Sequence, residues 1–215
     1  IRGWCFDQKS ISPQGFLMAK EIKSYTPVAN GFQYTDLPLD YPIRMLMLQS
    51  KSTDKEPGEV LAQVKLSEDN DKRIPIDMTG QEIFRKIASW YPQIHEQFDG
   101  ADAVTASDLY GAATAFVKGL AEVDADIIAA GDDFSQVTVA GNKLSVSLAV
   151  NCLYYGFHAF GYCPHFCLPI PFGDQDDLDD WYDVTKVGGL RLIQQGAAAV
   201  GTTPTGQIVL QQFRK

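Results

Sequence analysis

Short apolar runs separated by turn residues fill both ends of this 215-residue chain and limit most strongly what it can fold into. The run PIRMLMLQS places Ile43, Met45 and Met47 on one face of an extended strand and its leucines on the other, because successive side chains of a strand point to opposite sides. Apolar residues on both faces predict a strand that is largely buried on both sides. Pro42 can begin a strand at the edge of a sheet but cannot sit inside a central one.

Similar runs recur through the first eighty residues. We expect strands in GFLMAKEIKSY, GFQYTDLP, PIRMLMLQS, VLAQVKL and RIPID. The Asn30-Gly31 pair and the polar segment KSTDKEPGE separate them, and the charged segment SEDNDK predicts a hairpin between the last two.

Strand-like periodicity returns after residue 134. The segment QVTVAGNKLSVSLAV predicts a hairpin about Gly141-Asn142, because apolar and polar residues alternate after that turn. Further strands are expected in CLYYGFHAF, HFCLPIPF, GLRLIQQG and QIVLQQF. Many short strands with such turns indicate a sandwich or a closed barrel.

Between these parts the apolar period becomes helical. Thr79 and Glu82 form a capping box, in which the threonine hydroxyl accepts a backbone N–H while the glutamate reaches back. A helix is expected to follow and to break near Tyr91, because Pro92 disfavours helical geometry in the residue before it. A second helix is expected from Ser107 to Gly131, with an apolar stripe made of Leu109, Ala113, Phe116, Leu120, Val123 and Ile127.

The change of period predicts three parts. Residues 1–78 form a β-rich module, residues 79–131 a helical insertion or connection, and residues 132–215 a second β-rich module. With 45% hydrophobic residues, the chain can bury a sizeable core.

Charge and composition exclude several classes of function. The net charge is −9, and residues 101–183 hold thirteen acidic residues against Lys118 and Lys143. Such a surface repels phosphates, so direct nucleic-acid binding is not expected. No apolar run approaches the roughly 20 residues that cross a bilayer. The chain opens at Ile1 with neither a start methionine nor a secretory leader, as expected of a trimmed or partial product.

Four cysteines, Cys5, Cys152, Cys163 and Cys167, are too few and too irregularly spaced for a disulfide scaffold, so a reducing compartment is expected.

The segment HAFGYCPHFCLPIPFG resembles a metal site at first sight, because it holds His158, Cys163, His165 and Cys167. In a regular strand, same-face neighbours lie about 6.6 Å apart, whereas ligands of one tetrahedral zinc converge to within roughly 4 Å. Regular strand geometry therefore forbids a single site, although Pro164 could bend the segment and His158 could join it. We expect buried cysteines and a tucked histidine instead.

The segment DQDDLDDWYD supplies the six carboxylates of Asp174, Asp176, Asp177, Asp179, Asp180 and Asp183. An EF-hand needs glycine at loop position six and glutamate at position twelve, where this chain has Asp179 and Thr185. A loosely built calcium site remains an alternative. The favoured interpretation is a solvated loop that Leu178, Trp181 and Tyr182 anchor to the core.

Catalytic motifs give no support for an enzyme. Only His95, His158 and His165 could act as histidine bases, and the sequence has no G-x-S-x-G, Walker-type, G-x-G-x-x-G or H-E-x-x-H motif. We therefore predict no catalytic, cofactor-binding or metal-binding residue. The aromatic segments WYPQIHEQF and LYYGFHAFGY suit a protein interface, sugar stacking or core packing.

Two segments carry a family resemblance. DLPLDYPIRMLMLQSKSTDKEPGEVLAQVKLSEDNDKRIPID resembles a part of double jelly-roll major capsid proteins of tailless icosahedral phages and related viruses, in which a Leu-Pro/Tyr-Pro-Ile-Arg turn precedes a strand and a hairpin about a D-N-x-K loop. The terminal DVTKVGGLRLIQQGAAAVGTTPTGQIVLQQFRK is similar to the closing strands of their second barrel. Together they cover about 75 of the 215 residues.

The resemblance implies a mainly β chain of antiparallel jelly-roll barrels with two inserted helices. It implies a structural protein of the virion, assembled in the host cytoplasm, that forms homotrimers with a hexagonal outline. Such trimers tile an icosahedral shell over an internal membrane and beside other capsid proteins. About five strands precede Thr79, too few for a complete first barrel, so either an upstream part is absent or the architecture is not a full double barrel.

Two alternatives stay open. A cupin-like, metal-dependent enzyme on a single jelly roll would place an H-x-H motif on its barrel strands, and this chain has none. A calcium- or carbohydrate-binding β-module would use Trp, Tyr and the aspartate-rich loop.

Overall fold

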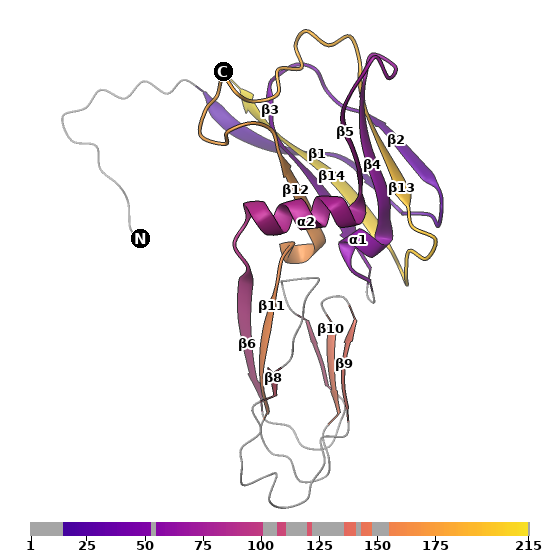
Figure 1. The fold of residues 1–215 in the computed structure, drawn as a ribbon, viewed down its shortest axis with the longest axis vertical. Helices are drawn as coiled ribbons and strands as arrows, with labels where there is room; N and C mark the ends of the chain where they lie inside the picture. Colours follow the sequence, from indigo (N-terminus) through magenta and orange to yellow (C-terminus); the bar gives the residue numbers. More distant parts are fainter. Residues whose placement is uncertain are drawn as a thin grey trace, which may run out of the picture.

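The computed structural model describes residues 15–52, 55–100, 107–110, 120–121, 136–140, 143–147 and 155–214. Over these residues the chain is mainly β, and every pair of neighbouring strands runs antiparallel. A sandwich of two four-stranded sheets occupies one end of the molecule, and two three-stranded sheets project from it (Figure 1).

The first sheet of the sandwich, sheet A, combines strands from the two ends of the sequence. Its order is β1 (Phe16–Tyr25), β14 (Thr205–Arg214), β3 (Ile43–Lys51) and β12 (Cys167–Pro171). The second, sheet B, has the order β2 (Phe32–Asp36), β13 (Leu190–Gly196), β4 (Leu61–Glu68) and β5 (Arg73–Thr79).

The path of the chain through these sheets is that of a jelly roll. Apart from the β4–β5 hairpin, consecutive strands of the sandwich alternate between sheet A and sheet B. Eight antiparallel strands wound in this way into two facing sheets define one jelly roll. The two complete eight-stranded rolls that the sequence resemblance implies are not found among the described residues.

The two predicted β-rich modules, 1–78 and 132–215, do not fold as separate units. Strands from one segment lie between strands from the other, as in the order β1-β14-β3-β12. Each strand finds its ladder partners far away in sequence, and periodicity carries no information about that pairing. The strand positions predicted for the sandwich are confirmed, and the two segments together supply its two sheets.

Alternating side chains of both sheets fill the space between them. Leu46, Leu48, Ile208 and Leu210 of sheet A are fully buried, as are Leu66 and Leu192 of sheet B. The β4–β5 hairpin turns through Asp69, Asn70 and Asp71, whose φ angles of 48°, 58° and 66° are left-handed. Asp and Asn tolerate this region better than most residues do, which explains why SEDNDK forms the predicted turn.

Two short helices lie beside the sandwich. α1 (Pro57–Val60) interrupts the β3–β4 connection and was not expected from the sequence. α2 (Gly80–Trp90) begins at the predicted capping box: Glu82 N donates to Thr79 Oγ1 at 3.2 Å, and Thr79 N donates to Glu82 Oε2 at 2.8 Å. It ends before Tyr91, as predicted from Pro92.

Helix α2 covers one side of the sandwich. It buries Ile83 and Ile87 against the core and contacts β4, β5 and β12, thereby spanning the gap between the two sheets on that side (Figure 1).

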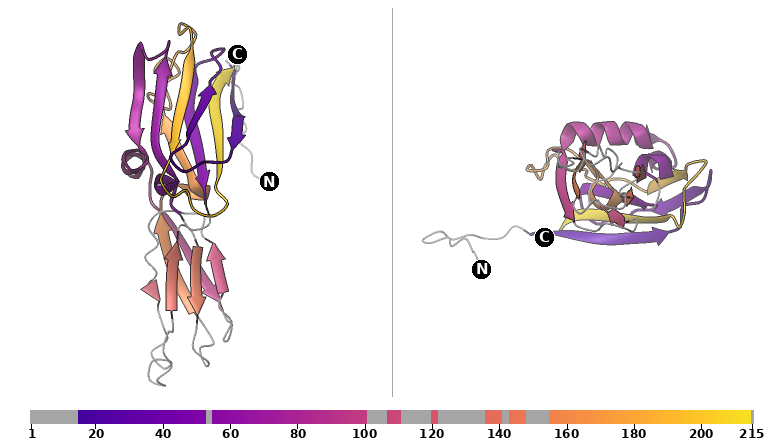
Figure 2. Two further views of the ribbon diagram at one scale, coloured as in Figure 1. Left: turned by 90° about the vertical axis from the view of Figure 1, so that its right-hand side faces the viewer. Right: turned by 90° about the horizontal axis from the view of Figure 1, so that it is seen from below.

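An insertion between β5 and β12 carries the projecting sheets (Figure 2). One has the order β6 (Ile94–Gly100), β11 (Tyr155–Gly161) and β8 (Leu120–Ala121). The other has the order β7 (Ser107–Tyr110), β10 (Lys143–Ser147) and β9 (Gln136–Ala140). The predicted hairpin is confirmed in its arms, β9 and β10, while its turn at residues 141–142 lies outside the described residues.

The second helix predicted from Ser107 to Gly131 is wrong where the structure describes it. Ser107–Tyr110 pairs with β10, and Leu120–Ala121 pairs with β11. The rest of the predicted helix lies outside the described residues. Ladder hydrogen bonds with distant strands decide the backbone conformation here, and an apolar stripe at helical spacing does not outweigh them.

Candidate functional site

The segment that holds Cys163, His165 and Cys167 is bent and does not form one regular strand. Cys163 and His165 have left-handed φ angles of 54° and 55°, and Pro164–Phe166 forms a 3₁₀ turn, η1, before β12 begins at Cys167. Cys163 is buried, as expected, whereas Cys167 is only half-buried. The prediction of a tucked histidine is wrong for His165, which the bend turns into solvent. The side chain of His158 lies outside the described part of β11.

The two thiols of this segment are protonated at neutral pH. Burial raises the pKa of Cys163 to about 12 and that of Cys167 to about 11. Since the thiolate is the nucleophile and the metal ligand, neither cysteine is poised for such chemistry. The described residues contain no group of three or more His, Cys, Asp or Glu side chains placed to hold a metal ion.

The aspartate-rich loop uses its carboxylates to hold backbone turns. Asp176 N donates to Asp174 Oδ1 at 3.0 Å, Asp179 N to Asp177 Oδ1 at 3.0 Å, and Asp174 N to Asp180 Oδ2 at 2.6 Å. These carboxylates therefore satisfy backbone donors inside the loop instead of converging on one point.

Aromatic residues anchor this loop to the sandwich. Trp181 is buried and donates from Nε1 to Asp174 O at 2.8 Å, and the Tyr182 ring stacks on Phe172 with its centroid 5.0 Å away. These two anchors are confirmed, but Leu178 is exposed, so its predicted anchoring role is wrong.

The interior of the jelly roll contains no chemistry-bearing cluster among the described residues. Positions that face the opposite sheet hold mainly aliphatic side chains with no exposed surface, including Leu46, Leu66, Leu192 and Leu210. A cupin-like metal site needs histidines at such inward positions. The surfaces considered next are therefore the outer faces of the two sheets.

The outer face of sheet B is charged. Arg191 Nε donates to Asp36 Oδ1 at 2.7 Å, Lys65 Nζ donates to Asp71 Oδ2 at 2.8 Å, and Gln63 Nε2 donates to Asp77 Oδ1 at 2.5 Å. The hydrogen bond from Arg191 holds the pKa of the Asp36 carboxyl below its usual range. Exposed, paired charges of this kind are typical of a solvated surface.

A groove of about 580 Å³ crosses this face beside the exposed ring of Tyr34. Asp36, Arg191 and the Asp69–Asp71 turn form its polar walls, and Gly189 lies in it. Gly189 N donates to Asp69 Oδ1 at 2.8 Å, and a Cβ atom on Gly189 would meet nothing within 4 Å. The sequence did not single out this groove, because its walls come from three separate segments.

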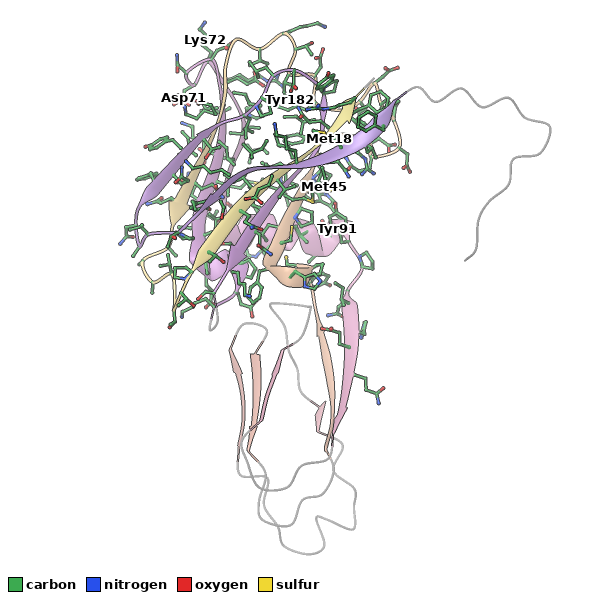
Figure 3. The ribbon with its side chains drawn as sticks, turned by 180° about the vertical axis from the view of Figure 1, so that it is seen from behind. Met18, Met45, Asp71, Lys72, Tyr91 and Tyr182 are labelled. Carbon is green, nitrogen blue, oxygen red and sulfur yellow. The ribbon has the colours of Figure 1, made fainter. Side chains whose placement is uncertain are left out.

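The outer face of sheet A is different. Its rows, read across the strands in the order β1, β14, β3 and β12, are Ala19-Gln211-Met45-Pro171, Glu21-Val209-Met47-Pro169 and Ser24-Gln207-Gln49-Cys167. We call these twelve residues the sheet A outer face. The row positions on β14, β3 and β12 are half-buried, whereas those on β1 are exposed. No described element covers them (Figure 3).

Comparisons with known proteins leave the family open. No protein-family model matches the chain, and no curated protein matches it. Among solved structures, it is similar to the major capsid protein P2 from bacteriophage PM2, with 7% sequence identity, a TM-score of 0.29 and coverage of 93% of this chain and 98% of that chain. A TM-score of this size does not establish a shared fold.

Proposed function

We propose that this chain is a structural subunit of a viral shell and not an enzyme. The observation that carries the proposal is a jelly roll whose interior is packed mainly with aliphatic side chains and whose sheet A presents a broad outer face with few charges. The packed interior disfavours an internal active site, and an outer face with few charges suits contact with another protein. Jelly rolls are a recurrent architecture of viral capsid proteins.

The edges of the sheets also support a subunit role. Strand β12 carries Pro169 and Pro171, and Phe172 N donates to Arg44 O of β3 at 3.0 Å. The nitrogens of both prolines therefore point to the free edge, where they cannot donate to another strand. Such an edge prevents uncontrolled strand pairing, so specific contacts with other chains would use the faces of the sheets.

The assembly unit we propose is the homotrimer that the sequence resemblance implies, built into a shell of the virion. In the double jelly-roll family, a hexagonal outline arises from three subunits with two rolls each. With one roll per chain, six copies would supply the same number of rolls. Copy number is therefore the quantity to measure.

Sedimentation velocity of the purified chain tests the proposal. We expect discrete homo-oligomers built from trimers or from six copies, which convert to larger closed or sheet-like assemblies at higher protein concentration. A single species with the mass of one chain at all concentrations would contradict the shell function.

A binding module is the second candidate, and the groove beside Tyr34 is the observation that favours it. An exposed aromatic ring next to carboxylates and a guanidinium suits a neutral, hydroxyl-rich ligand such as a saccharide. Gly189→Leu would fill the groove without a backbone clash. Binding to a glycan array that Gly189→Leu abolishes would support this candidate, whereas binding that is unchanged in the variant would contradict it.

A further inference from the structure

The sheet A outer face is almost free of charge. Glu21, on edge strand β1, is the only charged residue among its twelve positions. Lys51, the next position of β3 on the same side, is charged and exposed at the border of the face. Nearby Arg44 is already engaged, since it donates to Gln211 Oε1 at 2.6 Å and to Gln175 O at 3.1 Å. Its guanidinium also lies 5.6 Å from the centroid of the Trp181 ring. A sheet face that remains in water normally carries charged or hydroxyl-bearing residues, as sheet B does.

Strand addition at either edge of sheet A is disfavoured, so a contact through this sheet would use its outer face. On β1, Lys20 and Lys23 pair with the inward positions Leu210 and Ile208, and Lys23 Nζ donates to Tyr34 O of sheet B at 3.5 Å. Inward-pointing lysines at an edge block the approach of a further strand. The opposite edge, β12, lacks N–H donors at its two prolines.

Charge indicates which partner fits this face. The whole chain carries a net charge of −9, so two copies repel each other over most of their surface. The twelve positions of the sheet A outer face add only one charge, that of Glu21, to this repulsion. The larger polar side chains of this face are the amides of Gln49, Gln207 and Gln211, which lie in the two outer rows, and an amide both donates and accepts hydrogen bonds. Gln49 already donates from Nε2 to His165 O at 2.9 Å. Amide and apolar groups can therefore pair with identical groups, as a two-fold symmetric contact requires.

We propose that the sheet A outer face binds the same face of a second copy of this chain. The two sheets would pack with their flat faces together, about 10 Å apart. Val209 and Met47, which are direct neighbours in the middle row, lie at the centre of the contact. This surface assignment rests on the proposed shell function, because it names one of the contacts through which copies would join.

Lysine substitutions at the centre test the contact. Val209→Lys and Met47→Lys place an ammonium group at half-buried positions, from which it can reach water in the monomer. In a two-fold contact each substitution would bury two unpaired charges. We expect self-association to weaken by roughly a hundredfold, equivalent to about 2.7 kcal/mol, in size-exclusion chromatography with light scattering. The matched control is Ile193→Lys, at a half-buried position on the middle of sheet B.

Methionine oxidation supplies a second readout in the unmodified chain. Met45 and Met47 belong to the sheet A outer face, whereas Met78 packs against the core between the sheets. With dilute hydrogen peroxide and mass spectrometry, we expect Met45 and Met47 to become protected as protein concentration rises. Their protection should be lost in Val209→Lys, while the oxidation of Met78 stays the same in both proteins.

The outcomes separate this inference from the shell function. If the wild type and Val209→Lys assemble equally well, the proposed contact through the sheet A outer face is wrong and the shell function stands. If the wild type forms only a dimer and Val209→Lys abolishes it, the proposed contact is supported and the shell function is contradicted. If Met45 and Met47 are protected in a monomer at every concentration, a segment of the same chain covers the face, and the second-copy contact is overturned.

Discussion

The two outer faces of the sandwich differ in chemistry, although the strands of both sheets have the same alternating pattern. Sheet B turns Asp36, Lys65 and Arg191 outward and pairs each of them with a neighbour, whereas sheet A turns methionine, valine, proline and glutamine outward. Both sheets bury aliphatic residues inward. The core therefore explains why the chain folds, and the contrast between the outer faces is the basis on which we propose a contact through sheet A.

The largest expected effect separates an inward from an outward position on one strand. Leu210 is fully buried, and its neighbour Val209 is half-buried on the outer face. Leu210→Ala should lower the free energy of unfolding by about 2–5 kcal/mol, because it leaves a cavity in the core. Val209→Ala should lower it by less than about 1 kcal/mol. Denaturant titration of monomeric protein measures both, and equal losses would contradict the assignment of faces.

A buried carboxylate at the end of sheet B gives the next largest effect. The Tyr182 hydroxyl donates a hydrogen bond to Oε1 of Glu68, which is buried. Arg73 Nη1 lies 3.4 Å from the same Oε1 atom. Tyr182→Phe should lower the free energy of unfolding by about 1–3 kcal/mol, because Glu68 loses its hydroxyl donor. The double variant Tyr182→Phe/Glu68→Gln should recover part of the loss. No recovery in thermal unfolding would indicate that Tyr182 acts through ring packing alone.

A pH-dependent effect is expected at Glu56, next to α1. Burial, and secondarily the charge of Glu59, raises the pKa of Glu56 from 4.5 to about 7. Between these values the folded state holds a proton that the unfolded state has lost, so stability falls as pH rises through this window. Glu56→Gln should therefore raise the melting temperature at pH 8 and leave it little changed at pH 4. The same difference at both pH values would contradict this origin.

The smallest effect is expected from the exposed ion pairs of sheet B. Arg191→Ala removes the partner of Asp36, and both side chains are exposed. Exposed pairs contribute little to stability because water screens them. We expect a melting temperature close to that of the wild type and, if a saccharide binds the groove, weaker binding. A large loss of stability would show that the two outer faces are less different than described.

The sequence predicted local features of the fold better than its long-range ones. The capping box at Thr79, the break before Pro92 and the turn through Asp69–Asp71 depend on neighbouring residues, and all are confirmed. The pairing of β1 with β14 joins the two ends of the sandwich, and no local signal specifies it. The helix expected from Ser107 failed for the same reason, because distant strands decide that backbone.

The strand at Ile43–Lys51 shows how a correct pattern can be misread. Its apolar residues on both faces predicted burial on both sides, and Pro42 indicated an edge. The structure places β3 between β14 and β12 with Pro42 just outside it, and leaves Met45 and Met47 half-exposed. Periodicity reports that a face is apolar. It does not report whether the same chain or another copy covers that face.

Electron microscopy of the purified protein at assembly-promoting concentration tests the central claim most directly. The account predicts regular tiles or closed shells for the wild type and for Ile193→Lys, and their loss in Val209→Lys. Fields of isolated single chains in all three proteins would contradict the claim that this jelly roll is a shell subunit.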